Sequence, residues 1–181
     1  MKTSVVVLSY NRPQLIHQVL MDLSINAKSA HEIVVVENGS DDPACKEVID
    51  TWLHARNMSV PIIVKYLPEN VGFSKAMNKG IFKATGDVVV ALSNDVRINH
   101  PDFIEEIERN FDHNHYLLYG GTVYTQNTGW NTFGSLTVPY VEGYCVVASS
   151  QMWALLGGFD DAFYPYDFED VDLSYRAVQL G

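Results

Sequence analysis

Three groups of polar residues follow three short apolar runs in this 181-residue chain. The groups are Ser9-Tyr10-Asn11, Glu37-Asn38-Gly39-Ser40-Asp41 and Ser93-Asn94-Asp95. Carboxylates, amides and hydroxyls can bind the base and ribose hydroxyls of a nucleoside, and the ring of Tyr10 can stack on a base. A carboxylate such as Asp95 can bind a divalent cation, which in turn can bind a diphosphate. These residue types therefore predict a site for a phosphorylated nucleoside.

The apolar runs before these groups are the elements that must position them. Val88 to Leu92 form a continuous apolar run after Gly86, as expected of a strand buried on both faces of a parallel sheet. Residues 4–9 and 32–37 have the same character, with many β-branched side chains. Ligands of open α/β sheets bind beyond the carboxyl ends of the strands. We therefore expect the three polar groups at one edge of one sheet.

Helical patterns alternate with the expected strands. Pro13 suits the first position of a helix whose apolar residues recur at helical spacing. Further helices are expected over 43–56, from about 73 towards Gly86, and over 101–112, with a third strand over 61–67. The alternation predicts an α/β fold with a mostly parallel central sheet flanked by helices, and with a Rossmann-like nucleotide-binding first half.

The second half of the chain has a different character. Residues 120–139 are rich in Gly, Thr, Asn and aromatic residues, which predicts irregular hairpins or a mobile loop. Strands are compatible with 116–119 and 144–148, and a short helix with 150–156. The spacing of four residues predicts a final helix that packs them inward: Phe168, Val171, Tyr175 and Val178. We interpret residues 1–181 as one domain, with a nucleotide-sugar-binding half over about 1–112 and an acceptor and catalytic half over about 113–181.

Composition and charge exclude several functions. The net charge of −10 argues against a nucleic-acid binder. Residues 157–181 contain six acidic residues against Arg176, which fits either a solvated face or carboxylates gathered for a metal, a sugar hydroxyl or proton transfer. No apolar run approaches the roughly 20 residues of a membrane span, and the N-terminus lacks a signal-peptide pattern. Cys45 and Cys145 are too far apart in sequence to suggest a zinc site. A cytoplasmic protein, free or peripheral to the membrane, is expected.

Two other nucleotide-binding classes are disfavoured by missing motifs. No Gly-x-Gly-x-x-Gly follows the first expected strand, and the chain has no Gly-Lys-Ser/Thr loop. Dinucleotide and P-loop binding are therefore disfavoured. A nucleotidyltransferase would also use an α/β sheet with metal-bound phosphates, but the Gly-rich basic loop expected there is missing. A metal at Asp95 is the more natural partner for phosphate charge.

Taken in order, several blocks of the sequence resemble family 2 glycosyltransferases. The blocks span nearly the whole chain: residues 6–12 (VVLSYNR), 34–41 (VVVENGSD), 70–80 (NVGFSKAMNKG), Gly86-Asp87, Asn94-Asp95, 157–160 (GGFD), Phe163-Tyr164 and 168–173 (FEDVDL). The bacterial rhamnosyltransferase-like branch is the most similar, by the Asn-Val-Gly-Phe and Gly-Gly-Phe-Asp blocks.

The resemblance implies an A-type glycosyltransferase fold and an inverting transfer from a nucleoside-diphosphate sugar, of UDP or dTDP type, to a hydroxyl acceptor such as a growing glycan. It implies a divalent metal, Mn²⁺ or Mg²⁺, with Asp95 as its ligand, and a role in polysaccharide biosynthesis. The Glu169-Asp170 pair would supply the general base, with Asp170 favoured. The resemblance also implies a set of substrate-binding residues: Ser9, Tyr10, Asn11, Arg12, Glu37, Asn38, Asp41, Asn70, Gly72, Lys75, Asn78, Asn94 and Gly143.

Two departures from the family pattern leave an alternative open. Ser93 stands where the metal motif of the family has its first acid, so one carboxylate would anchor the metal. The chain ends at Gly181, whereas relatives usually continue, often with a His that assists the metal or diphosphate. The alternative is a degenerate module that binds nucleotide sugar without turnover. Among single residues, Tyr10 could be core, Asn70 and Gly72 could form only a turn, and the acids at 169 and 172 could only favour a helix N-terminus.

Overall fold

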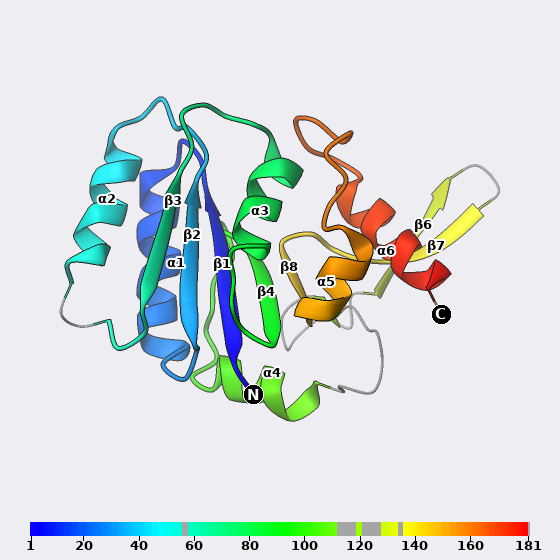
Figure 1. Cartoon of the computed structure of the whole chain (residues 1–181), viewed down its shortest axis with the longest axis horizontal. Coiled ribbons are helices and arrows are strands. Elements are labelled where there is room, and N and C mark those ends of the chain that lie inside the picture. Colours follow the sequence, from blue (N-terminus) through cyan, green and yellow to red (C-terminus); the bar gives the residue numbers. More distant parts are fainter. Residues whose placement is uncertain (56–57, 112–118, 121–127, 134–135, 181) are drawn as a thin grey trace.

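The computed structural model describes residues 1–55, 58–111, 119–120, 128–133 and 136–180, with side chains described outside 119–139. A six-stranded sheet of order β3-β2-β1-β4-β8-β5 lies at its centre (Figure 1). Its strands are β1 (Thr3–Ser9), β2 (Glu32–Glu37), β3 (Ile62–Tyr66), β4 (Val88–Ser93), β5 (Tyr119–Gly120) and β8 (Cys145–Ser149). A separate hairpin consists of β6 (Thr128–Phe133) and β7 (Leu136–Val141).

The strands of the first half are parallel. β1 pairs with β2 and with β4, and β2 pairs with β3, all in parallel, whereas β8 runs antiparallel to β4 and β5. In this register Ser9 lies opposite Glu37, and Leu8 lies opposite Ser93. The predicted mostly parallel sheet is confirmed, and the carboxyl ends of β1, β2 and β4 meet at one edge.

Six helices are present in the described part of the chain: α1 (Pro13–Asn26), α2 (Ala44–Leu53), α3 (Phe73–Ile81), α4 (Phe103–Asn110), α5 (Ser150–Leu156) and α6 (Glu169–Gln179). Pro13 is the first residue of α1, as predicted, where the missing N–H of proline costs nothing. α2, α3 and α4 are shorter than the sequence patterns suggested. The residue range described contains no helix long and apolar enough to cross a bilayer.

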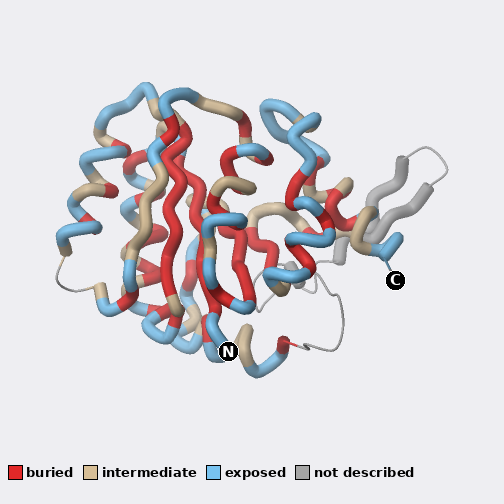
Figure 2. Tube along the Cα trace, viewed as in Figure 1, coloured by how far each residue is buried: buried red, intermediate tan, exposed pale blue. Residues whose placement is uncertain are grey.

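The sheet separates two hydrophobic cores because successive strand residues face opposite sides. Val5 and Val7 pack with α1, whereas Val6 and Leu8 pack with α3 and α5. Figure 2 shows the resulting continuous burial of the central strands. α3 can approach the sheet closely at Gly80, where a Cβ would lie 2.3 Å from the Cγ1 of Val6. The last turn of α3 therefore lies directly against β1 and β2, since the same Cβ would also meet the side chain of Val36.

The predicted inward face of the last helix is wrong. Phe168, Tyr175 and Val178 are 45%, 45% and 52% exposed, and of the four residues only Val171 is buried. Polar contacts select a different face. The Ser174 hydroxyl donates to the Asp170 carbonyl at 2.7 Å and accepts from the Val141 N–H at 2.9 Å, which directs this side of α6 towards β7. Three- and four-residue spacing alone could not distinguish these faces.

Candidate active site

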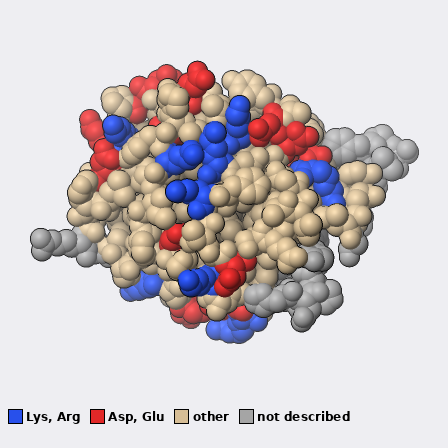
Figure 3. Space-filling model, viewed as in Figure 1, with Lys and Arg blue, Asp and Glu red and all other residues tan. Residues whose placement is uncertain are grey.

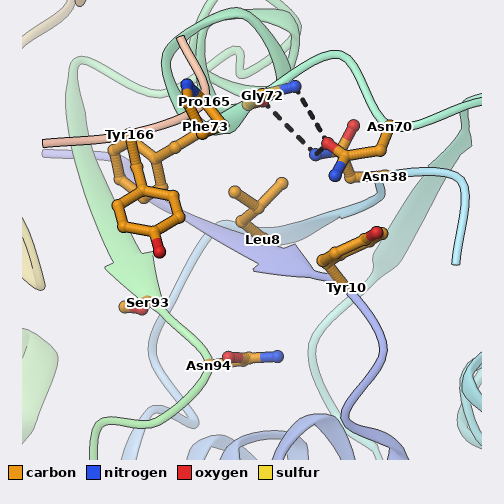
Figure 4. A pocket seen from close by; sticks show the side chains of 10 residues that line it. All are labelled: Leu8, Tyr10, Asn38, Asn70, Gly72, Phe73, Ser93, Asn94, Pro165 and Tyr166. Carbon is orange, nitrogen blue, oxygen red and sulfur yellow. Dashed lines mark hydrogen bonds between the residues drawn. The ribbon is translucent and has the colours of Figure 1, made fainter. Parts of the chain in front are cut away.

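A pocket of about 230 Å³ opens at the carboxyl edge of the sheet. β1 and β4 form its floor, and the start of α3 and the loop before α6 form its walls (Figure 4). Its lining residues come from segments far apart in the sequence: Leu8, Tyr10, Asn38, Asn70, Gly72, Phe73, Ser93, Asn94, Pro165 and Tyr166. A pocket therefore lies at the edge of the sheet where the sequence predicts a site.

The alternation of side chains along a strand decides which residues at the end of β1 face the pocket. Leu8 and Tyr10 line it, and Tyr10 is 36% exposed, so this ring is not part of the core. Ser9 is fully buried on the side of β1 that Val5 and Val7 share. The Ser9 Oγ has no hydrogen-bond partner among the described atoms.

Asn38 and Asn70 fix the loop that leads into α3. The Asn38 Nδ2 donates to the Asn70 Oδ1 at 2.9 Å and to the Gly72 carbonyl at 3.3 Å, and its Oδ1 accepts from the Val71 N–H at 3.0 Å (Figure 4). The Asn70 Oδ1 also accepts from the Gly72 N–H at 2.9 Å. Asn70 and Gly72 are thus turn residues and pocket residues at once.

The loop before α6 packs against the start of α3. Gly72 has φ +84°, and a Cβ there would lie 2.7 Å from the ring of Tyr164. The Phe73 N–H donates to the Pro165 carbonyl at 2.8 Å. These contacts place Pro165 and Tyr166 in the pocket wall, a role that no sequence pattern predicts. The only signal for it was the concentration of aromatic residues within the acidic segment.

The polar groups after β1 and β2 bind each other. The Glu37 carboxylate, 6% exposed, accepts from the Gly39 N–H at 3.2 Å and the Ser40 N–H at 3.0 Å, and also from the Ser40 hydroxyl. Asn11 donates its N–H to the Ser40 Oγ at 2.9 Å and accepts from the Asp41 N–H at 2.8 Å. Glu37, Asn11 and Asp41 therefore shape the two loops, and their contact with a nucleotide stays a prediction.

Asn78 acts as a clamp between α3 and the segment after α5. Its Nδ2 donates to the Phe159 carbonyl at 2.7 Å, and its Oδ1 accepts from the Phe159 N–H at 2.9 Å. Arg12 and Lys75 are exposed, and neither belongs to the described pocket lining. The predicted substrate contacts of these three residues have no counterpart in the pocket geometry and stay predictions.

Asp170 is bound to the segment that leads into β8. Its Oδ2 accepts from the Gly143 N–H at 2.9 Å. The following residue, Tyr144, accepts the Ser93 N–H at 2.8 Å through its carbonyl oxygen. Two consecutive residues thus link the Asp170 carboxylate to Ser93 in the pocket floor. Neither Asp170 nor Gly143 belongs to the described pocket lining, so their predicted roles stay predictions.

Glu169 lies in a different environment from Asp170. It is 8% exposed, and this burial raises the pKa of its carboxyl group, with the Asp170 and Asp167 charges acting in the same direction. The two residues before it, Asp167 and Phe168, have φ values of 103° and 65°. Such conformations are costly for residues with side chains and are concentrated at functional sites.

Asp172, by contrast, has a structural partner. It pairs with Arg176 one turn later, at 2.8 Å between Oδ2 and Nε. The same guanidinium donates to the Leu156 and Gly158 carbonyls at 2.5 and 2.9 Å. Arg176 therefore ties α6 to the end of α5, and Asp172 completes that link.

Figure 3 shows acidic side chains at the upper rim of the face in view, on either side of a group of basic side chains.

The metal site predicted at Asp95 stays a prediction, and the oxygen donors around it are of a suitable kind. Asp95 is exposed and follows Ser93 and Asn94, which line the pocket. Hydroxyl, amide and carboxylate oxygens suit Mg²⁺ or Mn²⁺. Among the residues that the structure describes, no three His, Cys, Asp or Glu side chains gather to hold a metal ion. The residues fit a site that diphosphate oxygens and water would complete.

Comparison with known proteins gives related sequences. The sequence profile of "Glycosyl transferase family 2" matches residues 4–161. The chain is 25% identical over 194 residues to the amylovoran biosynthesis glycosyltransferase AmsE of Erwinia amylovora, covering 98% of this chain and 70% of AmsE. It is 23% identical to the O-antigen biosynthesis protein RfbC of Myxococcus xanthus, of which it spans 16%.

Solved structures share the fold. The mannosyltransferase PcManGT from Pyrobaculum calidifontis, in complex with GDP-Man and Mn²⁺, superposes with a TM-score of 0.81 at 18% identity over 99% of this chain. S. aureus TarS 1–349 in complex with UDP superposes with a TM-score of 0.71 at 21% identity over 98% of this chain. The chain spans about half of each, 52% and 55% respectively. The similarity confirms the predicted A-type fold.

Proposed function

Because the chain belongs to glycosyltransferase family 2, we propose that it transfers one sugar from a nucleoside diphosphate to a hydroxyl acceptor, with inversion of the anomeric centre. The donor occupies the pocket at the carboxyl edge of the sheet. The UDP and GDP-Man complexes of the two structural relatives support a nucleotide-sugar donor. The names of AmsE and RfbC support a glycan acceptor in polysaccharide biosynthesis.

The observation that carries this proposal is the link from Asp170 to β4. A general base must reach the acceptor hydroxyl on the face of the sugar opposite the leaving diphosphate. Asp170 belongs to α6, a different element from the strand ends. Its hydrogen bond to Gly143 ties it to the residue before Tyr144, whose carbonyl accepts from the Ser93 N–H in the pocket floor. Asp170 takes the proton of the acceptor hydroxyl as the new glycosidic bond forms and the bond to the diphosphate breaks. Glu169, whose pKa is raised by burial, is the rival base.

The aromatic residues of the pocket orient the donor. Tyr10 offers a partly exposed ring for the base, and Tyr166, 71% exposed, lies on the opposite wall (Figure 4). An aromatic face binds both nucleobases and the apolar faces of sugars. Asn38 and Asn70 hold the loop that leads into α3, so this part of the pocket wall is fixed by hydrogen bonds.

A divalent metal would be held by Asp95, with oxygen donors from Ser93 and Asn94. When bound, it would supply positive charge to stabilise the leaving diphosphate. The Mn²⁺ in the complex of PcManGT supports this assignment. The residues of this chain contribute one carboxylate, so metal affinity depends on the donor being present.

A donor panel tests the proposal. The protein is incubated with UDP-, dTDP- and GDP-sugars, with Mn²⁺ or with EDTA, and with candidate acceptors, and nucleoside diphosphate release is measured. Release from one donor class, stimulated by an acceptor and by Mn²⁺, is expected. Saturable binding of a donor without release under any condition would overturn transfer and favour a nucleotide-sugar-binding module, which Ser93 in the metal motif makes the second candidate.

A further inference from the structure

Asp22, on α1, is a buried carboxylate that does not line the pocket. It is 6% exposed, and four hydrogen bonds surround it. The Oδ2 accepts from the Arg97 Nε at 2.7 Å and from the Ile98 N–H at 3.2 Å. The Oδ1 accepts from the Gln18 Nε2 at 3.0 Å and from the Arg97 Nη2 at 3.3 Å. Burying a carboxylate costs free energy unless its oxygens accept hydrogen bonds. These contacts therefore fix the positions of Arg97 and Ile98 relative to α1.

Asn26, one turn further along α1, completes the attachment. Its Nδ2 donates to the Ile98 carbonyl at 2.6 Å, and it is 9% exposed. Both backbone polar groups of Ile98 are therefore bound by side chains of α1, and the Ile98 side chain is 4% exposed within the core that α1 covers. Ile98 is a fixed point of the chain.

This fixed point lies three residues after Asp95. On the other side, Ser93 is fixed because its N–H donates to the Tyr144 carbonyl at 2.8 Å and its own carbonyl accepts from the Val96 N–H at 3.4 Å. Asn94 and Asp95 thus form a short turn between two anchored positions. One anchor is the sheet, and the other is α1.

We propose that Asp22 and Asn26 are positioning residues that hold the Ser93–Asp95 turn in its donor-binding arrangement. The inference rests on the proposed function, since it assigns that turn to the donor site. Asp22 acts in a second way as well. It binds the guanidinium of Arg97, two residues from Asp95. Without Asp22, that cation is free to pair with Asp95 and to compete with any other partner of its carboxylate.

The expected change in donor KM follows from the fraction of molecules in which the turn has the binding arrangement. A loosened turn spends a smaller fraction of time in the binding arrangement, so the apparent dissociation constant rises by the inverse of that fraction. Bound donor restores the arrangement. Asp22→Asn replaces one accepting oxygen by an NH₂ group, which cannot accept hydrogen bonds from Arg97 or Ile98. This variant should therefore raise the donor KM about tenfold and leave kcat within about twofold.

Glu32 offers a matched control. Glu32 is 5% exposed and lies at the start of β2, at the end of the sheet opposite to the Ser93–Asp95 turn. Its carboxylate accepts hydrogen bonds from the Ser4 Oγ at 2.8 Å and from the Thr85 N–H at 2.6 Å. Glu32→Gln therefore disturbs an equally buried carboxylate without touching the turn. It should lower thermal stability as Asp22→Asn does, with an unchanged donor KM.

The test combines hydrogen exchange with kinetics on the full chain. Backbone amides of 94–98 should exchange at least about tenfold faster in Asp22→Asn and in Asn26→Ala, and at the wild-type rate in Glu32→Gln. Unchanged exchange in both test variants would overturn the proposal, as would an equal rise in donor KM in Glu32→Gln. Exchange is measured without substrate, so it tests whether Asp22 and Asn26 hold the turn even if the wild-type protein releases no nucleoside diphosphate. That absence of release would contradict the proposed function alone.

Discussion

The Oδ2 of Asp170 accepts a hydrogen bond from the backbone N–H of Gly143 at 2.9 Å. The two residues meet closely, since a Cβ at Gly143 would lie 3.3 Å from the Cβ of Asp170. The other carboxylate oxygen accepts from the Val171 N–H at 2.8 Å. Both oxygens are thus oriented by backbone groups, which leaves the carboxylate preorganised next to Gly143.

Replacing Asp170 tests its role as the base. Asp170→Asn keeps the shape of the side chain but removes the proton acceptor, so transfer should fall by about 10²–10⁴-fold while donor affinity stays near wild type. Transfer rates and nucleotide titrations measure the two effects. Asp172→Asn removes the same charge from the same helix but breaks only the Arg176 pair, so it should retain most of the transfer activity. Near-normal transfer by Asp170→Asn would move the base to Glu169.

Replacing Asp95 tests the metal assignment. Asp95 is exposed, so Asp95→Ala should leave the fold and its thermal unfolding unchanged. Nucleoside diphosphate affinity in the presence of Mn²⁺ should fall to the level seen with EDTA, because the variant lacks the carboxylate that links the metal to the protein. Titration calorimetry with and without Mn²⁺ measures this. A variant that keeps the full Mn²⁺ effect would exclude Asp95 as the ligand.

Two adjacent glycines separate backbone strain from steric clash. Gly157 and Gly158 have φ values of 72° and 77°, but a Cβ at Gly157 meets nothing within 4 Å, whereas one at Gly158 would lie 2.2 Å from the Asn78 Oδ1. Gly157→Ala should cost about 1–2 kcal/mol of unfolding free energy from backbone strain. Gly158→Ala should cost about 2–5 kcal/mol, because overpacking against the Asn78 clamp is added. Equal costs in denaturant unfolding would contradict the clamp.

The Asp22 network predicts a pH dependence of stability. Burial alone would raise the pKa of Asp22, but hydrogen bonds from Arg97, Ile98 and Gln18 outweigh it and lower the pKa below its ordinary value of 3.8. The stabilisation is therefore complete above that value and is lost as the pH falls through the folded-state pKa. The unfolding free energy of the wild type should exceed that of Asp22→Asn by about 1–3 kcal/mol at pH 7. This difference should shrink below about pH 4.

Urea unfolding from pH 7 to pH 3 measures this difference. Glu105→Gln, which removes an exposed carboxylate of α4, serves as the control and should show no comparable pH-dependent gap. A gap between wild type and Asp22→Asn that stays constant down to pH 3 would mean that the ionised carboxylate is not the source of the stabilisation.

The first half of the fold could be predicted because its signals are local. Continuous β-branched runs mark buried parallel strands, Pro13 marks a helix start, and polar residues mark the strand ends. Parallel pairing then forces those ends to one edge. The pocket at that edge, with Tyr10, Asn38 and Asn94 in its lining, follows from this rule.

The rest depends on contacts between distant segments. The wall formed by Pro165 and Tyr166 exists because the Pro165 carbonyl accepts the N–H of Phe73, 92 residues earlier. The Asp22–Arg97 pair spans 75 residues, and no local pattern marks either residue. The face of α6 was mispredicted because Ser174 and Arg176 bind other elements, and spacing does not report polar anchors.

The anomeric configuration of the first transferred product tests the central claim most directly. With Asp170 as a base that activates the acceptor hydroxyl, one displacement joins acceptor and sugar as the diphosphate leaves. Proton NMR of early product, made from the donor that the panel identifies, should show the anomeric configuration opposite to that of the donor. A product with the donor's own configuration would contradict this account.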